Sequence, residues 1–113
     1  SEQIILAGFS QGGAVVYQAC YTFDQPLGGL LVLSSYFATS NSIVINEANK
    51  NTPILIQHGT RDPIVAPVLG ERALQFVKNF NADVNYETYT MEHTLCGEQV
   101  MSIARWLQER LIK

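Results

Sequence analysis

The stretch Ile4–Ala19, IILAGFSQGGAVVYQA, joins an apolar run to a helix-like segment through a single serine, Ser10. The apolar run, Ile4–Ala7, is continuous rather than alternating, which is typical of a strand covered on both faces in a parallel sheet. Gly8-x-Ser10-x-Gly12 between a strand and a helix is the pattern of a nucleophile elbow, a sharp turn that exposes a serine hydroxyl. We expect both glycines to be required, because larger side chains at these positions would clash with neighbouring chain.

The rest of the sequence alternates in the same way between short apolar runs and amphipathic segments. The expected strands are Ile4–Ala7, Leu30–Leu33, Ile54–Gln57 and Val84–Tyr89, and the expected helices are Gly12–Thr22, Pro67–Phe80 and Glu98–Ile112. This order predicts an α/β fold, a parallel sheet of about four strands with flanking helices. The residues expected to face the core are Ala14, Val15, Ala19 and Cys20 in the first helix, and Val100, Ile103, Ala104, Leu107 and Leu111 in the last. The polar segment Ala38–Asn51 is expected to be a long excursion.

Composition excludes several classes of function. The 113 residues suffice for one domain, and the net charge of −3 provides no basic surface for nucleic acid or an anionic membrane. No apolar run approaches the roughly 20 residues that span a bilayer. Cys20 and Cys96 are far apart and match no metal-ligand spacing, so we expect free thiols in a reducing compartment.

A serine hydroxyl needs a base, and the base needs a group that orients it. His93 follows the last expected strand, and Asp62 follows the third. Since strand exits in a parallel sheet share one edge, Ser10, Asp62 and His93 are expected to meet there. Their chain order, Ser-Asp-His, is the one found in α/β-hydrolases.

Each of these residues also has a structural interpretation. The glycine-rich turn also suits a nucleotide-binding sheet, although neither phosphate-binding glycine motif is complete. His93 could be a surface loop residue and Asp62 a turn or helix-capping residue. His58, at the end of the third strand, is the competing base and is interpreted as structural. Cys96 is interpreted as a packed or idle thiol.

Three blocks of sequence resemble one family. GFSQGGA around Ser10, HGTRDPIV around Asp62 and MEHTLCGEQ around His93 resemble the signature blocks of the carboxylesterase and acyl-protein thioesterase family, of the phospholipase/carboxylesterase type. The resemblance implies Ser10 as nucleophile, His93 as general base and acid, Asp62 as the group that orients His93, and the Gln11 N–H as one oxyanion donor. It implies cytosolic serine hydrolases without cofactors, acting on small acyl esters or thioesters, some on lysophospholipids or S-acylated proteins.

The resemblance also implies that similar enzymes carry about as much chain again before the elbow, including a second oxyanion donor. Residues 1–113 would then be the C-terminal half of an α/β-hydrolase domain, and Ile4–Ala7 would become an open edge strand. We therefore expect the chain to pair with an N-terminal segment or to self-associate through that edge. The alternative is a catalytically silent fragment that acts only in folding or assembly. Tyr36 and Phe37 either line the site or pack in the core, and the other substrate-binding residues stay unknown.

Overall fold

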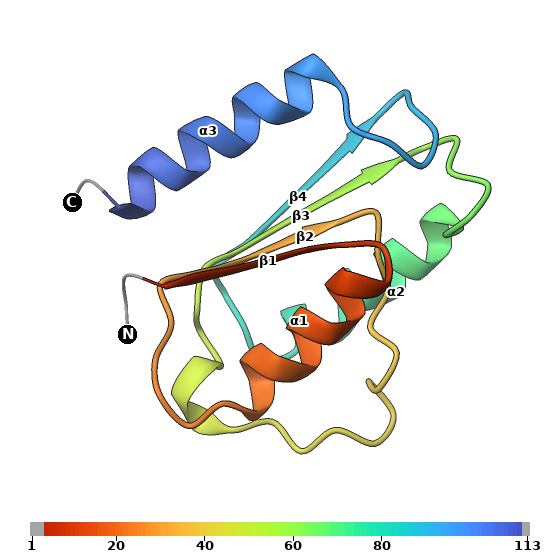
Figure 1. The fold of residues 1–113 in the computed structure, drawn as a ribbon. Coiled ribbons are helices and arrows are strands. Elements are labelled where there is room, and N and C mark those ends of the chain that lie inside the picture. Colours follow the sequence, from red (N-terminus) through yellow and green to blue (C-terminus); the bar gives the residue numbers. More distant parts are fainter. Residues whose placement is uncertain (1–3, 112–113) are drawn as a thin grey trace.

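The computed structural model describes residues 4–111 and contains one four-stranded sheet (Figure 1). The strands β1 (Ile5–Phe9), β2 (Gly29–Leu33), β3 (Ile54–Gly59) and β4 (Val84–Tyr89) are all parallel and lie in the order of the sequence. Each connection is therefore a crossover that brings the chain back to the end of the sheet where the preceding strand began. The predicted α/β class and the number of strands are confirmed.

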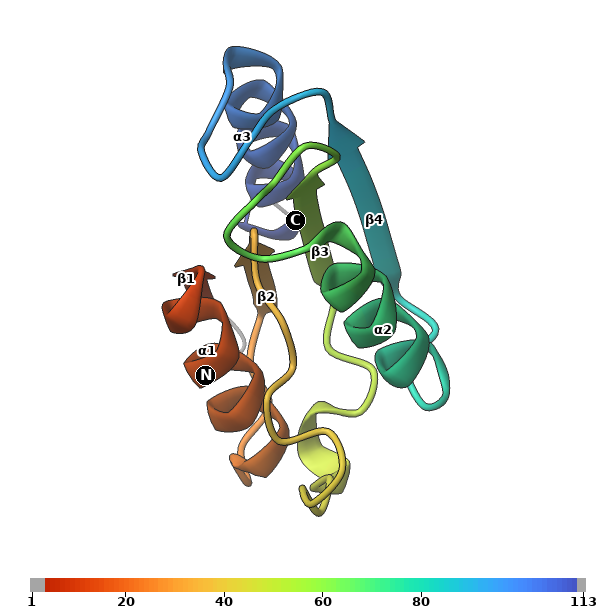
Figure 2. The same ribbon diagram turned by 90° about the vertical axis from the view of Figure 1, so that its right-hand side faces the viewer.

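Helices cover both faces of this sheet (Figures 1 and 2). The helices α1 (Gln11–Thr22) and α2 (Pro67–Lys78) lie against one face, and α3 (Gly97–Leu111) crosses the other. Pro67 begins α2, where its missing N–H costs no hydrogen bond. None of the helices within residues 4–111 has the length and apolarity to cross a bilayer.

The larger core lies between the sheet and the helices α1 and α2. Its centre is aromatic: the rings of Tyr17 and Phe37 stack with centroids 4.5 Å apart, and Tyr21 meets Phe80 edge to face at 5.1 Å. The smaller core lies under α3, where Trp106 packs on sheet residues. Phe37 thus belongs to the core, which decides one of the two alternatives stated above for that residue.

Two of the predicted helix faces are partly wrong. In α1, Val15 is 65% exposed and Ala19 is exposed, whereas the core face consists of Gly13, Tyr17, Cys20 and Tyr21. In α3, Val100 and Ala104 are exposed, and the buried residues include Gln99, Ser102 and Trp106. The side chain of Leu111, and Ile112, lie outside the described residues. Counting apolar residues misled here because aromatic and polar side chains also turn inward: Tyr17 stacks on Phe37, and Ser102 donates to Glu87.

The polar excursion Ala38–Asn51 is anchored by a buried amide. It contains a short 3₁₀ helix, η1 (Glu47–Asn49), and Asn49 is fully buried. The Asn49 side chain accepts from the Leu27 N–H at 2.9 Å and donates to the Gln25 carbonyl at 2.9 Å. These bonds satisfy the backbone between α1 and β2, and they fix a segment whose sequence has no periodic pattern.

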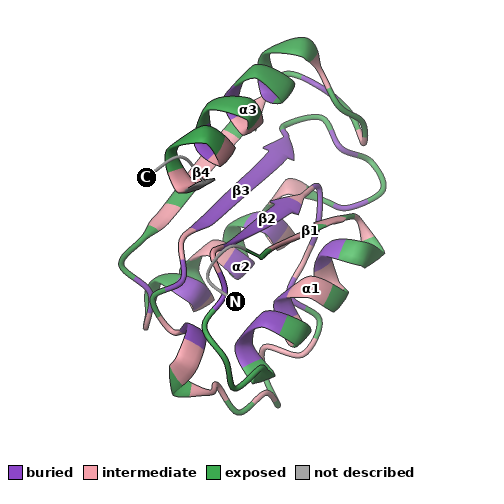
Figure 3. Ribbon diagram, turned by 60° about the vertical axis from the view of Figure 1, so that its left-hand side comes forward, coloured by how far each residue is buried: buried purple, intermediate pink, exposed green. Residues whose placement is uncertain are grey.

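Strand β1 lies at one edge of the sheet and, among the described residues, pairs only with β2. Whereas every residue of β3 is buried, β1 is only partly covered, with Ala7 and Phe9 exposed (Figure 3). The expected open edge at Ile4–Ala7 is therefore present. Unpaired N–H and C=O groups on such an edge are a template for another strand.

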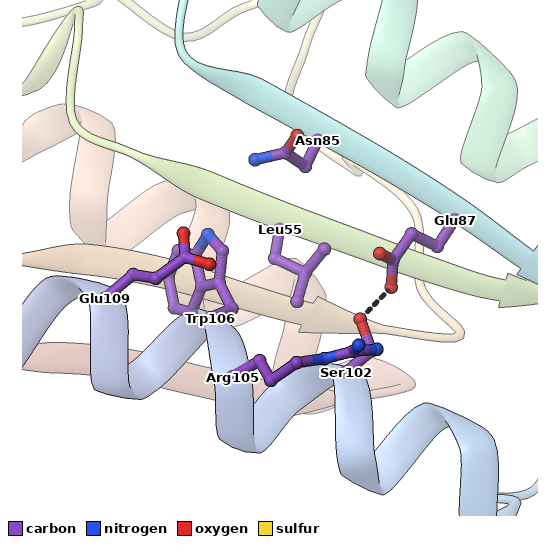
Figure 4. Close-up of a pocket in the computed structure, with 7 residues that line it drawn as sticks. All are labelled: Leu55, Asn85, Glu87, Ser102, Arg105, Trp106 and Glu109. Atoms are coloured by element: carbon purple, nitrogen blue, oxygen red, sulfur yellow. Dashed lines mark hydrogen bonds between the residues drawn. The ribbon is translucent and has the colours of Figure 1, made fainter.

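A carboxylate ties α3 to strand β4 (Figure 4). Glu87 Oε1 accepts hydrogen bonds from Ser102 Oγ at 2.6 Å, Gln57 Nε2 at 2.8 Å and the Tyr89 hydroxyl at 2.8 Å. Burial by itself raises the pKa of Glu87, but these three donors and the charge of Arg105 together hold the pKa below its ordinary value. The ionised form therefore stabilises the fold.

We predict that Glu87→Gln lowers the free energy of unfolding at neutral pH by on the order of 1 kcal/mol, because charge-assisted hydrogen bonds become neutral ones. The folded-state pKa lies below the ordinary one, so the advantage of Glu87 is complete above about pH 4.3. It disappears as the pH falls through the folded-state pKa. Urea unfolding of both proteins at pH 7 and pH 3 measures this, and an equal difference at both values would contradict it.

Candidate active site

Three strand exits place Ser10, Asp62 and His93 at the carboxyl edge of the sheet. Ser10 follows β1, Asp62 lies in the loop after β3, and His93 lies in the loop after β4 (Figure 1). His93 Nε2 is 3.0 Å from Ser10 Oγ, and His93 Nδ1 is 2.7 Å from Asp62 Oδ2. Because a carboxylate only accepts, Nδ1 carries the proton and Nε2 is free to accept from the serine hydroxyl. The structure thus brings the three predicted residues into one hydrogen-bonded chain.

Ser10 occupies a backbone conformation that is uncommon for residues other than glycine, with φ 57° and ψ −120°. Two contacts with the exit of β2 hold it there. The Ser10 N–H donates to the Leu33 carbonyl at 2.9 Å, and Ser35 Oγ donates to the Ser10 carbonyl at 2.5 Å. Ser35 is a residue that sequence reasoning missed, since it lies 25 positions away and carries no motif of its own.

The glycines around Ser10 are required, but not in the expected pair. A Cβ at Gly8 would overlap the backbone of the first helical turn, 2.6 Å from the Gly13 nitrogen. A Cβ at Gly12 would meet nothing within 4 Å, so the expected requirement at that position is wrong. A Cβ at Gly13 would overlap the Ser35 side chain. The close approaches are therefore between Gly8 and the helix, and between Gly13 and the exit of β2.

Gln11 is the first residue of α1, directly after Ser10. Backbone N–H groups in the first turn of a helix have no acceptor within the helix, and the helix dipole adds a partial positive charge there. The Ser10 carbonyl accepts from Gly13 and Ala14, which starts the helical hydrogen bonding. This local geometry suits the stabilisation of negative charge next to Ser10.

The Asp62 carboxylate is held from both sides. Its Oδ1 accepts from the backbone N–H groups of Ile64 at 2.9 Å and Val65 at 2.8 Å, and its side chain is fully buried. Burial raises the pKa of Asp62, but the hydrogen bonds from His93, Val65 and Ile64 outweigh it and lower the pKa below the ordinary value. Asp62 therefore presents an ionised oxygen to His93 at neutral pH.

The His93 ring lies between Asp62 and Ser10 and packs against Phe9. The two ring centroids are 4.7 Å apart at an angle of 40°, and the His93 side chain is 15% exposed. Phe9 is the variable position of the Gly8-x-Ser10 motif, so the motif carried no signal for this contact. This packing restricts rotation of the imidazole ring.

An open groove of about 480 Å³ borders Ser10. Its walls are partly apolar, formed by the following residues: Phe9, Ser10, Gln11, Tyr36, Ile64 and Val65. Tyr36 thus lies at the site, whereas its neighbour Phe37 does not. Ile64 is 71% exposed at the mouth of the groove. A groove of this size and composition can accept a small substrate with an apolar part.

The two remaining candidates lie outside this hydrogen-bonded chain. The His58 ring is buried beneath the Asp62 loop, where its Nε2 is 2.8 Å from the Val65 carbonyl. Cys96 is a free, partly exposed thiol on a different depression, with Tyr89 and Glu98. Within residues 4–111, no three His, Cys, Asp or Glu side chains are grouped so that they could hold a metal ion.

Comparison with known proteins places these features in one group. The model of the phospholipase/carboxylesterase family matches residues 1–111. The chain is 36% identical to acyl-protein thioesterase 1 of Gibberella zeae, with 97% of the chain and 49% of that protein aligned. It is 33% identical to carboxylesterase SOBER1 of Arabidopsis thaliana, with 97% of the chain and 50% of that protein aligned.

Solved structures agree with the sequence comparison. The crystal structure of Arabidopsis thaliana SOBER1 superposes with a TM-score of 0.87 at 30% identity, covering 97% of this chain and 54% of that one. The fold is therefore that of a portion of an α/β-hydrolase carboxylesterase. The chain spans about half the length of the curated relatives it matches.

Proposed function

The chain belongs to the phospholipase/carboxylesterase family, and we propose that it hydrolyses carboxylic esters or acyl thioesters through an acyl-enzyme on Ser10. The observation that carries the proposal is the continuous hydrogen bonding from Ser10 Oγ through His93 to Asp62, over 3.0 Å and 2.7 Å. The relatives are named as acyl-protein thioesterases and carboxylesterases, which supports this class of reaction.

In the first half of the reaction, Ser10 Oγ attacks the acyl carbonyl carbon while His93 Nε2 takes the hydroxyl proton. The carbonyl oxygen becomes an oxyanion, and the Gln11 N–H at the start of α1 is one donor to it. Asp62 stabilises the positive charge that His93 acquires, and it keeps Nδ1 protonated. The tetrahedral intermediate then collapses, and His93 returns the proton to the departing alcohol or thiol.

In the second half, water replaces the alcohol or thiol in the groove. His93 Nε2 removes a proton from the water, whose oxygen attacks the ester carbonyl on Ser10. Collapse of the second tetrahedral intermediate releases a carboxylic acid, and the proton returns to Ser10 Oγ. The acyl part of the substrate lies along the groove beside Tyr36 and Ile64. Small acyl esters and thioesters, lysophospholipids and S-acylated proteins are the proposed substrates.

We predict that Ser10→Ala reduces hydrolysis of a p-nitrophenyl acyl ester and of an acyl thioester to the background rate. Asp62→Asn should reduce the rate by on the order of 10⁴, as in other Ser-His-Asp hydrolases, because His93 loses its orienting carboxylate. Release of p-nitrophenol, with an initial burst, measures both the turnover and the acyl-enzyme.

Ser42→Ala is the matched control, because Ser42 is an exposed serine in the excursion after β2. It should hydrolyse both substrates at the rate of the unsubstituted protein. Equal turnover by Ser10→Ala and the unsubstituted protein would contradict the role proposed for Ser10.

We also propose that the β1 edge pairs with a further polypeptide, either a segment N-terminal to this chain or a second copy of it. Ile4 is 49% exposed beside the open edge, and Val100 on α3 is 51% exposed. The resemblance implies that an upstream segment supplies the second oxyanion donor, whose loss typically costs about 10²–10³ in rate. The alternative function, a catalytically silent assembly partner, rests on the same edge.

We predict that residues 1–113 alone self-associate, and that Ala7→Lys on the edge strand reduces the association, because a charge on an edge opposes strand pairing. Light scattering after size exclusion measures the mass. Gln75→Lys, on the exposed side of α2, is the control and should leave the mass unchanged. A stable monomer of residues 1–113 would contradict the pairing proposal.

The proposed location is the cytoplasm. Cys20 and Cys96 are both free thiols, as is usual in a reducing compartment.

A further inference from the structure

His58 lies at the end of β3, directly below the loop that carries Asp62, and the mechanism above does not use it. Its side chain is 1% exposed. The ring fits closely against α2: a Cβ added at Gly70 would lie only 2.6 Å from His58 Nδ1. A buried imidazole that is fixed in position close to the Asp62 carboxylate can help to set the orientation of that carboxylate.

The hydrogen bonding of His58 assigns its proton. Nε2 is 2.8 Å from the Val65 carbonyl, which can only accept, so Nε2 carries the proton. Nδ1 has no hydrogen-bond partner among the described residues, which agrees with this tautomer. The same Nε2 is 3.6 Å from Asp62 Oδ2. That separation is too long for a hydrogen bond, and the single Nε2 proton is already donated to Val65, so His58 acts on Asp62 through Val65 and not by a direct bond.

Val65 connects the two side chains. Its N–H donates to Asp62 Oδ1 at 2.8 Å, and its carbonyl accepts from His58. The Asp62 carboxylate therefore bonds to the backbone of its own turn, residues 62–65, and the His58 imidazole bonds that turn to β3. With Oδ1 fixed in this way, Oδ2 is left to meet His93 Nδ1 at 2.7 Å.

We propose that His58 is a positioning residue for the reaction: through the Val65 carbonyl it holds the Asp62 turn in the orientation that aims Oδ2 at His93. This inference rests on the function proposed for Ser10, Asp62 and His93. It gives a specific form to the structural role expected for His58 from the sequence, and it keeps His58 out of the proton transfer.

The test compares three replacements of His58. In His58→Gln the amide nitrogen can take the place of Nε2 and donate to Val65, whereas His58→Asn is too short and His58→Leu has no donor. The first readout is the rate at which a fluorophosphonate modifies Ser10. We expect His58→Leu and His58→Asn to react about 10–100-fold more slowly, because small misplacements of reacting groups cost rate on this scale. His58→Gln should recover most of the rate.

The second readout is the low-field proton resonance of His93 Nδ1–H in its bond to Asp62. It should shift or broaden in His58→Leu and His58→Asn, and be retained in His58→Gln. Val77→Ala is the control for general loss of stability, since Val77 is fully buried in α2 and part of the main core. It should lower the melting temperature and leave both the resonance and the labelling rate unchanged.

The outcomes separate this inference from the proposed function. A folded His58→Leu protein with an unchanged rate and resonance overturns the positioning role, as does a His58→Gln protein no better than His58→Asn. If His58→Leu does not fold, the comparison of Gln with Asn decides by the same criteria. If Ser10 of the unsubstituted protein does not react, the proposed function fails, and the His93 resonance still tests whether His58 positions Asp62.

Discussion

Ser10 is held in a strained backbone conformation with positive φ by the residues at the end of the neighbouring strand. Such a conformation costs on the order of 1–3 kcal/mol for a residue with a side chain. The Leu33 carbonyl, at the end of β2, accepts from the Ser10 N–H, and Ser35 Oγ, just beyond β2, donates to the Ser10 carbonyl. The space for the turn comes from Gly8 and Gly13. Without this turn the hydroxyl would not face His93, and α1 would not begin beside it. The packing of the surrounding sheet and helix stabilises the fold enough to offset this backbone strain.

Sheet topology supplies the other part of the site. The four parallel strands end at one edge, so the exits of β1, β3 and β4 bring residues 83 positions apart within 3.0 Å. The fold and this convergence could be predicted because they depend on local signals: continuous apolar runs, a glycine-flanked serine and polar loops after strands. The order of Ser10, Asp62 and His93 along the chain then named the residues that the structure brings together.

The remaining features depend on contacts that no local pattern records. Gly12 fits the motif, yet the close approach is at Gly13, because the neighbour is Ser35, just after the end of β2. Val15 and Val100 are apolar but exposed. Glu87, on β4, is charged but accepts a hydrogen bond from Ser102 on α3. The sequence predicts a structural role for His58 at the end of a strand, but only the fold shows that the role is a hydrogen bond to Val65 in the Asp62 turn. Gly13 and Glu87 meet partners that are remote in the chain, and His58 meets Val65, only seven positions away, through a loop whose path no local pattern records. The residue type alone could not reveal these contacts.

The proposed function requires Ser10 to be a nucleophile activated by His93 and Asp62. Denaturing intact-mass measurement, before and after treatment with a fluorophosphonate, tests it most directly because the reagent reacts with activated serines. We expect one adduct per chain, mapped to Ser10 by peptide sequencing. An unmodified protein, or an adduct on another residue, would contradict it.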